Sequence, residues 1–112
     1  MRCTEIKRET KETSITLRLN LDGAGVFQGS SGIGFFDHML TALAVHSGFD
    51  IDLEMKGDLE VDGHHSVEDV GIVLGQAFAQ VVDKKNIQRF GSFYVPMDES
   101  LAFCALDISG RP

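Results

Sequence analysis

The sequence has few cysteines, few basic residues and no long apolar run, and each scarcity excludes a class of protein. Its two cysteines, Cys3 and Cys104, lack CxxC spacing, so they predict no disulfide framework and fit a reducing cytoplasm. Ten basic against 17 acidic residues give a net charge of −7, which argues against nucleic-acid binding. No apolar run approaches the roughly 18 residues of a membrane span, and the polar start indicates no secretion signal. We expect a soluble cytoplasmic protein without nucleic-acid or membrane partners.

Hydrophobic periodicity predicts an α+β fold of mixed strands and helices. Alternation of apolar and polar residues predicts strands at 13–21, with 3–10 as hairpin partner, and at 49–57, with a short strand at 59–62. Helical spacing predicts helices over 35–48 and 65–83. The segments FYVP and SLAFCALDI indicate two more strands, and 28–34 and 84–91 are predicted loops. Because the elements do not alternate strictly, we expect a mixed sheet with helices packed on one face.

The helical spacing also predicts which side chains face the core. The residues expected there are Phe36, Met39, Leu40, Leu43 and Ala44 in the first helix, and Val67, Val70, Leu74, Phe78 and Val81 in the second.

A faint internal repeat suggests how the chain is organised. ETSITLRLNLDG (12–23) aligns with ESLAFCALDISG (99–110), although two amphipathic strands can match this well by chance. If the repeat is real, the chain ends shortly after a second copy begins. We therefore divide it into a first α+β repeat, 1–88, and the beginning of a second, truncated repeat, 89–112.

The segment DGHHSVED contains the main candidate ligands. On a helix, His64 and Glu68 are four residues apart and share a face, whereas His65 points about 100° away. One metal ion therefore does not easily take all three, and His65 serves a second ion or a substrate. Imidazole and carboxylate suit Mn²⁺, Fe²⁺, Co²⁺ or Zn²⁺. Further ligands must come from elsewhere, with His38 the first candidate and His46 eight residues beyond it.

Two further features suit an anionic substrate. The guanidinium groups of Arg89 and Arg111 can bind phosphate oxygens in bidentate fashion, although isolated arginines are more often surface residues. The stretch SSGIG (30–34) could offer backbone N–H groups to a phosphate before a helix N-terminus, although a Gly-rich loop of this kind is more often an ordinary linker.

Seven motifs occur in order along the chain: ETKET, GIGFFDHML, HSGFD, DGHHSVEDVGIVLG, RFG, PMDES and DISGRP. Together they resemble one enzyme family, imidazoleglycerol-phosphate dehydratase of histidine biosynthesis. The resemblance implies a hydro-lyase that converts imidazole glycerol phosphate to imidazole acetol phosphate. It also implies a fold of the ribosomal protein S5 domain 2-like group.

The resemblance further implies two Mn²⁺ ions per complete site, with other divalent metals as alternatives. By position, His38 and His65 would bind one ion, and His64 and Glu68 the other. The helical spacing separates His64 and Glu68 from His65 in the same way. A metal ion would act as template and Lewis acid.

The substrate is a small phosphorylated imidazole, and the resemblance assigns residues to it. Glu12 would contact the substrate and transfer protons, as base or only as binder. His46 and Glu68 join it as catalytic candidates, while Arg89 and Arg111 would face the phosphate. The full substrate-binding set is Glu12, His38, His46, His64, His65, Glu68, Arg89 and Arg111.

Family members are nearly twice this length, and their second half carries its own HHxxE block. The family forms homo-oligomers of 24 subunits with active sites between subunits. A half-length chain would rebuild the site by self-association, or it would be a fragment with an exposed sheet edge. A non-catalytic metal-binding or assembly module is the competing interpretation.

Overall fold

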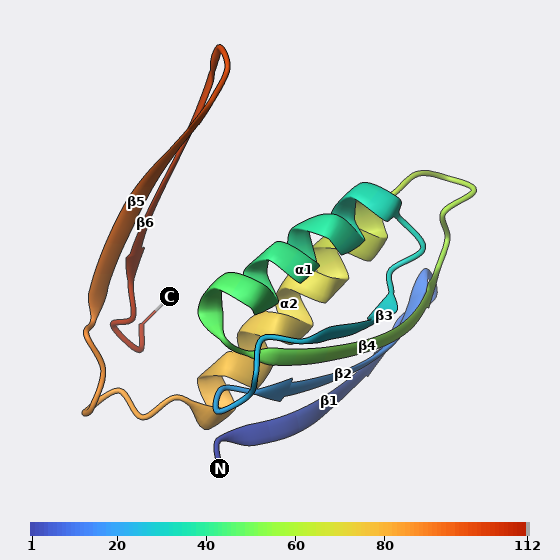
Figure 1. The fold of residues 1–112 in the computed structure, drawn as a ribbon. Helices are drawn as coiled ribbons and strands as arrows, with labels where there is room; N and C mark the ends of the chain where they lie inside the picture. Colours follow the sequence, from blue (N-terminus) through green and yellow to red (C-terminus); the bar gives the residue numbers. More distant parts are fainter. Residues whose placement is uncertain (112) are drawn as a thin grey trace. The chain divides into compact units, whose positions relative to one another are not determined.

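Alternating apolar residues in the first part of the chain form a mixed four-stranded sheet (Figure 1). In the computed structural model, which describes residues 1–111, β1 (Cys3–Glu9) pairs antiparallel with β2 (Thr13–Asn20). Strand β2 also pairs antiparallel with β4 (Asp50–Gly57), and β3 (Phe27–Ser30) adds to β4 in parallel. The strand order is β1-β2-β4-β3. The predicted hairpin and the predicted strand over 49–57 are confirmed.

Two helices cover one face of this sheet (Figure 1). Helix α1 (Gly34–Ser47) makes the crossover between the parallel strands β3 and β4, and α2 (His64–Val81) follows β4. Gly48 ends α1 with a left-handed conformation, as its position predicts. The α+β architecture with helices on one sheet face is confirmed. Within residues 1–111, no helix is both long and apolar enough to cross a membrane.

The core lies between the helices and the inner face of the sheet. Its buried apolar residues are Ile15, Leu17, Leu19, Leu21, Leu40, Ala44, Ile51, Leu53, Val70, Val73 and Ala77. Met39, Leu43 and Val67 were expected in this core, but they are 41%, 41% and 40% exposed. The other α2 residues expected there are confirmed, since Val70 is buried and Leu74, Phe78 and Val81 are partly buried against the core. The buried face of α2 also includes Ser66, Asp69, Val73 and Ala77.

The structure corrects two local predictions. The predicted loop over 28–34 begins as strand β3, which forms through backbone pairing with β4 and shows no apolar alternation of its own. The predicted strand over 59–62 is a turn, closed by a hydrogen bond from Val61 N to Asp58 O of 2.9 Å. Leu59 and Val61 have the alternation of a strand, but no strand within residues 1–111 pairs with them.

The chain from Asp83 onward forms a second compact unit. It contains β5 (Phe90–Met97) and β6 (Ser100–Asp107), which pair antiparallel as a hairpin. All side chains of both strands are exposed, although the rings of Tyr94 and Phe103 stack with centroids 4.5 Å apart. The two expected strands are confirmed, and β5 includes the last two residues of the predicted loop over 84–91. The repeat boundary at residue 88 concerns ancestry and stays a prediction.

Candidate metal and substrate site

The first turn and a half of α2 carries the pair of ligands that the spacing predicts. His64 Nε2 lies 3.4 Å from Glu68 Oε2, and the two side chains are 71% and 56% exposed. The shared helix face is therefore confirmed. Two atoms at this separation can bind the same cation, since metal–ligand bonds to nitrogen and oxygen are about 2 Å long.

His65 takes a different partner, as its position on the helix requires. Its Nδ1 lies 2.8 Å from Oδ2 of Asp58, in the turn after β4. This hydrogen bond is the main reason why the pKa of His65 is raised above its usual value. The negative charges of Asp58, Glu12 and Asp62 act in the same direction. Glu12 itself lies in the turn between β1 and β2.

Glu12 is held in that turn by local hydrogen bonds. Thr10 Oγ1 accepts the backbone N–H groups of Glu12, at 3.1 Å, and of Thr13, at 3.0 Å. Thr10 N donates to Thr13 O at 2.8 Å, which closes the hairpin. The Glu12 side chain lies on an exposed turn whose backbone is fixed, which suits a group that must meet a substrate.

A buried network ties this turn to α2. Thr13 Oγ1 donates to Asp69 Oδ2 at 2.5 Å, and the two residues are 4% and 8% exposed. Arg8 Nε lies 3.4 Å from the other carboxylate oxygen of Asp69. Asp69 follows Glu68 in sequence but faces inward. The network therefore places Glu12 at the same end of the sheet as the ligand pair on α2.

The N-termini of the two helices also meet at this end. A Cβ atom on Gly63, just before α2, would lie 2.9 Å from Cδ1 of Ile33, just before α1. A Cβ atom on Gly32 would likewise lie 2.6 Å from Cδ1 of Leu59. These contacts bring the start of α1, and with it His38 in its second turn, to the side of the fold that carries the start of α2.

The loop before α1 uses its polar groups internally. Asp37 accepts hydrogen bonds from Ser30 Oγ at 2.7 Å, Ser31 Oγ at 2.6 Å and Ser31 N at 2.7 Å. Burial alone would raise the pKa of Asp37, but these hydrogen bonds outweigh it and lower that pKa. Gly32 N and Ile33 N donate to Ser30 Oγ and Ser31 Oγ. Backbone N–H groups of this loop are therefore engaged, which argues against the phosphate site considered from the sequence.

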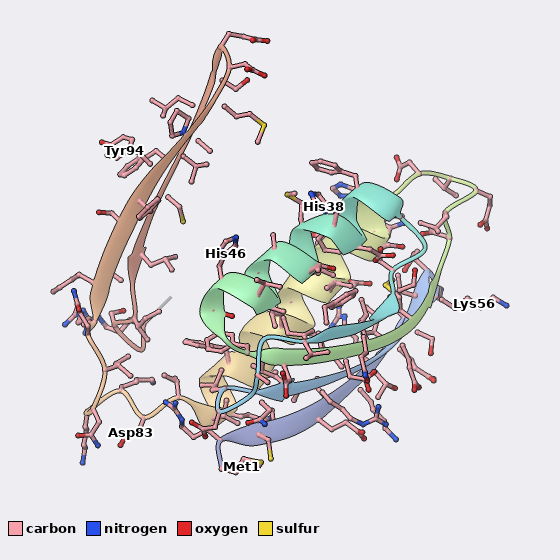
Figure 2. All side chains as sticks on the ribbon, viewed as in Figure 1. Met1, His38, His46, Lys56, Asp83 and Tyr94 are labelled. Carbon is pink, nitrogen blue, oxygen red and sulfur yellow. The ribbon has the colours of Figure 1, made fainter. Side chains whose placement is uncertain are left out.

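His38 and His46 project from opposite ends of α1 (Figure 2). Eight residues of helix separate them by about 12 Å, so only His38 lies at the end where the helix N-termini meet. No group of three or more His, Cys, Asp or Glu side chains suited to one metal ion occurs among residues 1–111. The structure thus brings together His64 and Glu68, and it places His38, but not His46, at the end of the fold where the helix N-termini meet.

The donor chemistry of this end of the fold suits a divalent metal as a partial ligand set. His64 and Glu68 offer one imidazole and one carboxylate to one ion, a combination that suits Mn²⁺ and its neighbours. His65 is engaged through Nδ1 only, so its second nitrogen remains for a ligand role. Any complete coordination sphere needs further donors from outside this cluster.

Arg89 and Arg111 belong to the second unit. Arg89 Nε and Nη2 donate to Asp107 Oδ1 and Oδ2 at 2.5 and 3.1 Å, which raises the pKa of Arg89 and lowers that of Asp107. The guanidinium is thus engaged by a carboxylate in the geometry that it would use for a phosphate. Arg111 is exposed, and its backbone N–H donates to Ser109 Oγ at 3.0 Å.

The best-defined hollow of the first unit lies away from the histidines. It has a volume of about 560 Å³ and opens on the sheet face that the helices leave uncovered. Its lining includes Glu5, Arg18, Gln28 and Asp52, and none of the predicted site residues. The candidate site therefore consists of the side chains near the N-termini of the two helices, and this hollow is not part of it.

Sequence reasoning missed two residues of the site, Asp58 and Asp69. Asp69 was visible in the motif HHSVED, but helical spacing alone does not say that its carboxylate turns inward. Asp58 lies seven residues before His65, and only the turn after β4 brings the two together.

Comparison with known proteins identifies the family. The family model for imidazoleglycerol-phosphate dehydratase matches residues 31–112. A protein of that name from Gluconobacter oxydans is 62% identical over 112 residues, and one from Lachnoclostridium phytofermentans is 58% identical. Each match covers 99% of this chain and 57% of the relative, so the chain spans just over half the length of these relatives.

Solved structures agree with the sequence matches. The crystal structure of imidazoleglycerol-phosphate dehydratase from Staphylococcus aureus has a TM-score of 0.77 at 35% identity, covering 98% of this chain and 59% of that one. A Pyrococcus furiosus structure, in complex with (S)-C348, has a TM-score of 0.75 at 36% identity, covering 96% and 56%. The chain belongs to the imidazoleglycerol-phosphate dehydratase family.

Proposed function

We propose that this chain contributes one half of a manganese-dependent dehydratase site, which converts imidazole glycerol phosphate to imidazole acetol phosphate in histidine biosynthesis. The observation that carries the proposal is the hydrogen bond from Thr13, the residue after Glu12, to Asp69 on α2. Hydrogen bonds at Thr13 and Asp69 hold the Glu12 turn against the helix that bears His64, His65 and Glu68. This arrangement supports a site in which the Glu12 carboxylate transfers protons and the imidazoles of α2 bind metal.

The metal ligands divide into two sets in this proposal. His64 and Glu68 serve one Mn²⁺ ion, and His65 with His38 serves another. Other divalent metals of similar ligand preference are possible occupants of both positions. A bound ion supplies Lewis-acid chemistry and a template for the substrate. Because each set holds only two donors, the remaining ligands come from the longer protein or from a second copy of the chain.

The other candidate residues act on the substrate. Glu12 accepts or donates a proton, and Glu68 lies close enough to share that task. Arg89 and Arg111 bind the phosphate, for which Arg89 exchanges its carboxylate partner Asp107 for the anionic substrate. His46 lines the distal side of the substrate site. The substrate-binding set thus joins these residues to the four proposed ligands.

The proposal also covers the cellular compartment and the oligomeric state. We infer a cytoplasmic enzyme, since cysteines are few and no pattern predicts a disulfide framework. We also infer a homo-oligomer, with 24 subunits as in the family it belongs to.

Metal content of the purified 112-residue protein tests the proposal, measured together with native mass and with turnover of imidazole glycerol phosphate. We expect about two Mn²⁺ ions per pair of chains in a discrete oligomer. The Glu68→Gln variant should bind fewer Mn²⁺ ions per pair of chains than the wild type, whereas Glu54→Gln, which removes a carboxylate from the outer sheet face, should bind as many. A metal-free monomer without turnover would contradict the proposal for this chain.

A second candidate function is a non-catalytic metal-binding or assembly module. It is favoured by one observation, namely that residues 1–111 contain no group of three or more metal ligands. In that case histidines would join subunits through shared ions without turnover. Metal bound in a discrete oligomer that leaves imidazole glycerol phosphate unchanged would distinguish this function from the first.

A further inference from the structure

Asp58 lies in the turn after β4 and holds one ring nitrogen of His65. The distance from Asp58 Oδ2 to His65 Nδ1 is 2.8 Å. The Asp58 side chain is only 15% exposed, whereas the His65 ring is 41% exposed. The carboxylate is thus largely withdrawn from water, and the imidazole that it holds still reaches the surface.

The chemistry of this contact determines where the ring carries its proton. An ionised carboxylate can only accept hydrogen bonds, so Nδ1 of His65 must be the donor. A neutral imidazole has a single N–H group, and with the proton on Nδ1 the lone pair lies on Nε2. A metal ion binds an imidazole through such a lone pair.

We propose that Asp58 is a positioning residue, which fixes the orientation of His65 and its Nδ1–H tautomer so that Nε2 is free to bind metal. This inference rests on the proposed function for the identity of the ligand that Nε2 meets. The tautomer itself is a property of the metal-free chain and can be tested without that assumption.

The backbone around Asp58 is rigid enough for this role. The turn is closed by the hydrogen bond from Val61 N to Asp58 O. The preceding residue, Gly57, packs against α2 so closely that a Cβ atom there would lie 2.1 Å from Ser66 Oγ. The end of β4 is therefore fixed against the helix that carries His65, one residue from Ser66. A carboxylate held in this way restricts the rotation of the ring.

A purely structural role for Asp58 explains less of what is observed. The start of α2 has a polar partner other than Asp58, since Asp62 Oδ1 accepts a hydrogen bond at 2.8 Å from the backbone N–H of His64, the first residue of the helix. Asp58 in contrast keeps its second oxygen, Oδ1, buried without a hydrogen-bond partner. Such an arrangement costs free energy, and it is typical of groups kept for function.

The two neighbouring aspartates provide a matched pair of variants. Asp58→Ala removes the partner of the ring, while Asp62→Ala removes an equal charge that contacts only the backbone of α2. Nitrogen-15 NMR of the imidazoles in the metal-free chain, about pH 8.5, reports which ring nitrogen carries the proton, and His65→Gln assigns the signals. We expect the Nδ1–H tautomer in the wild type and in Asp62→Ala, and mainly the Nε2–H tautomer in Asp58→Ala.

Titration calorimetry with Mn²⁺ completes the test. Loss of an outer hydrogen-bond partner typically lowers metal affinity 10- to 100-fold, so Asp58→Ala should bind about that much more weakly than Asp62→Ala. A wild-type chain with the Nε2–H tautomer, or an Asp58→Ala variant with an unchanged tautomer, would overturn the inference. The wild-type tautomer is read with His65→Gln as the only variant, so this measurement stands even if Asp58→Ala does not fold. The expected tautomers in a chain that binds no Mn²⁺ would uphold the role of Asp58 and overturn the proposed function.

Discussion

Thr13 joins the Glu12 turn to the interior of the first unit. Its hydroxyl group is the donor at 2.5 Å to one oxygen of the buried Asp69 carboxylate. Thr13→Val keeps the shape of the side chain but leaves that oxygen without its donor. We expect the free energy of unfolding to fall by about 1–3 kcal/mol, the usual cost of a buried polar group without a partner. Urea denaturation of the 112-residue chain measures it.

Thr16→Val is the control, because Thr16 lies on the same strand and its side chain is on the opposite sheet face, half-buried. That substitution should change the free energy of unfolding by less than about 0.5 kcal/mol. Equal losses in the two variants would show that the Thr13–Asp69 hydrogen bond does not hold the turn.

The contacts of some site residues could be predicted from the sequence, and those of others could not. His64 and Glu68 were predictable because their contact depends only on helical periodicity, and the 3.4 Å separation agrees. The partner of His65 was not predictable, since Asp58 reaches it through a turn that the sequence pattern had assigned to a strand. Contacts set by local geometry could be predicted, and contacts set by the path of the chain between elements could not.

Strand β3 depends on a glycine that no other residue can replace without displacing the strand. Gly29 has φ of +101°, and a Cβ atom there would lie 1.8 Å from the carbonyl oxygen of Leu53 on β4. Gly29→Ala must therefore separate the two strands or twist the backbone. We expect a loss of about 3 kcal/mol or more in the free energy of unfolding, from backbone strain and overpacking together.

Gly75→Ala provides the comparison for this substitution. Gly75 lies inside α2, where an added Cβ atom would meet no heavy atom within 4 Å. Alanine is the better helix former by about 1 kcal/mol, so this variant should be the more stable one. Thermal unfolding followed by circular dichroism compares both variants with the wild type. A Gly29→Ala variant as stable as the wild type would contradict the close approach of β3 to β4.

The larger elements were predictable where many residues agreed on one period. Strands β2 and β4 alternate buried and exposed side chains over their length, and the sequence predicts both. Strand β3 spans only Phe27–Ser30 and buries no residue fully, so no periodicity marks it. The α2 core was predicted less well at Val67, since the helix packs on the sheet through small and polar residues such as Ser66. Apolar patterns identify elements better than they identify the buried face.

The whole chain combines one unit with a core and one without. Residues Met1–Val82 bury 11 apolar side chains between sheet and helices. The β5–β6 hairpin leaves every strand side chain exposed, including Phe93, Tyr94 and Phe103. An isolated two-stranded hairpin is marginally stable in water. The family match with proteins almost twice as long is consistent with a hairpin that belongs to a larger sheet.

We therefore expect the 112-residue chain to self-associate through this hairpin. Its apolar side chains and the two strand edges that are unpaired within residues 1–111 favour pairing with a second copy. The net charge of −7 opposes association, because the copies repel each other. Sedimentation equilibrium should show a mass above that of the 12.2 kDa monomer.

Phe103→Lys removes the ring that stacks on Tyr94 and adds a charge, so it should shift the equilibrium toward monomer at least tenfold. Ser100→Lys adds the same charge beside the hairpin turn without removing apolar surface, and it should shift the equilibrium much less. If the wild type is monomeric at all concentrations, or if the two lysine variants behave alike, association does not run through the apolar face of the hairpin.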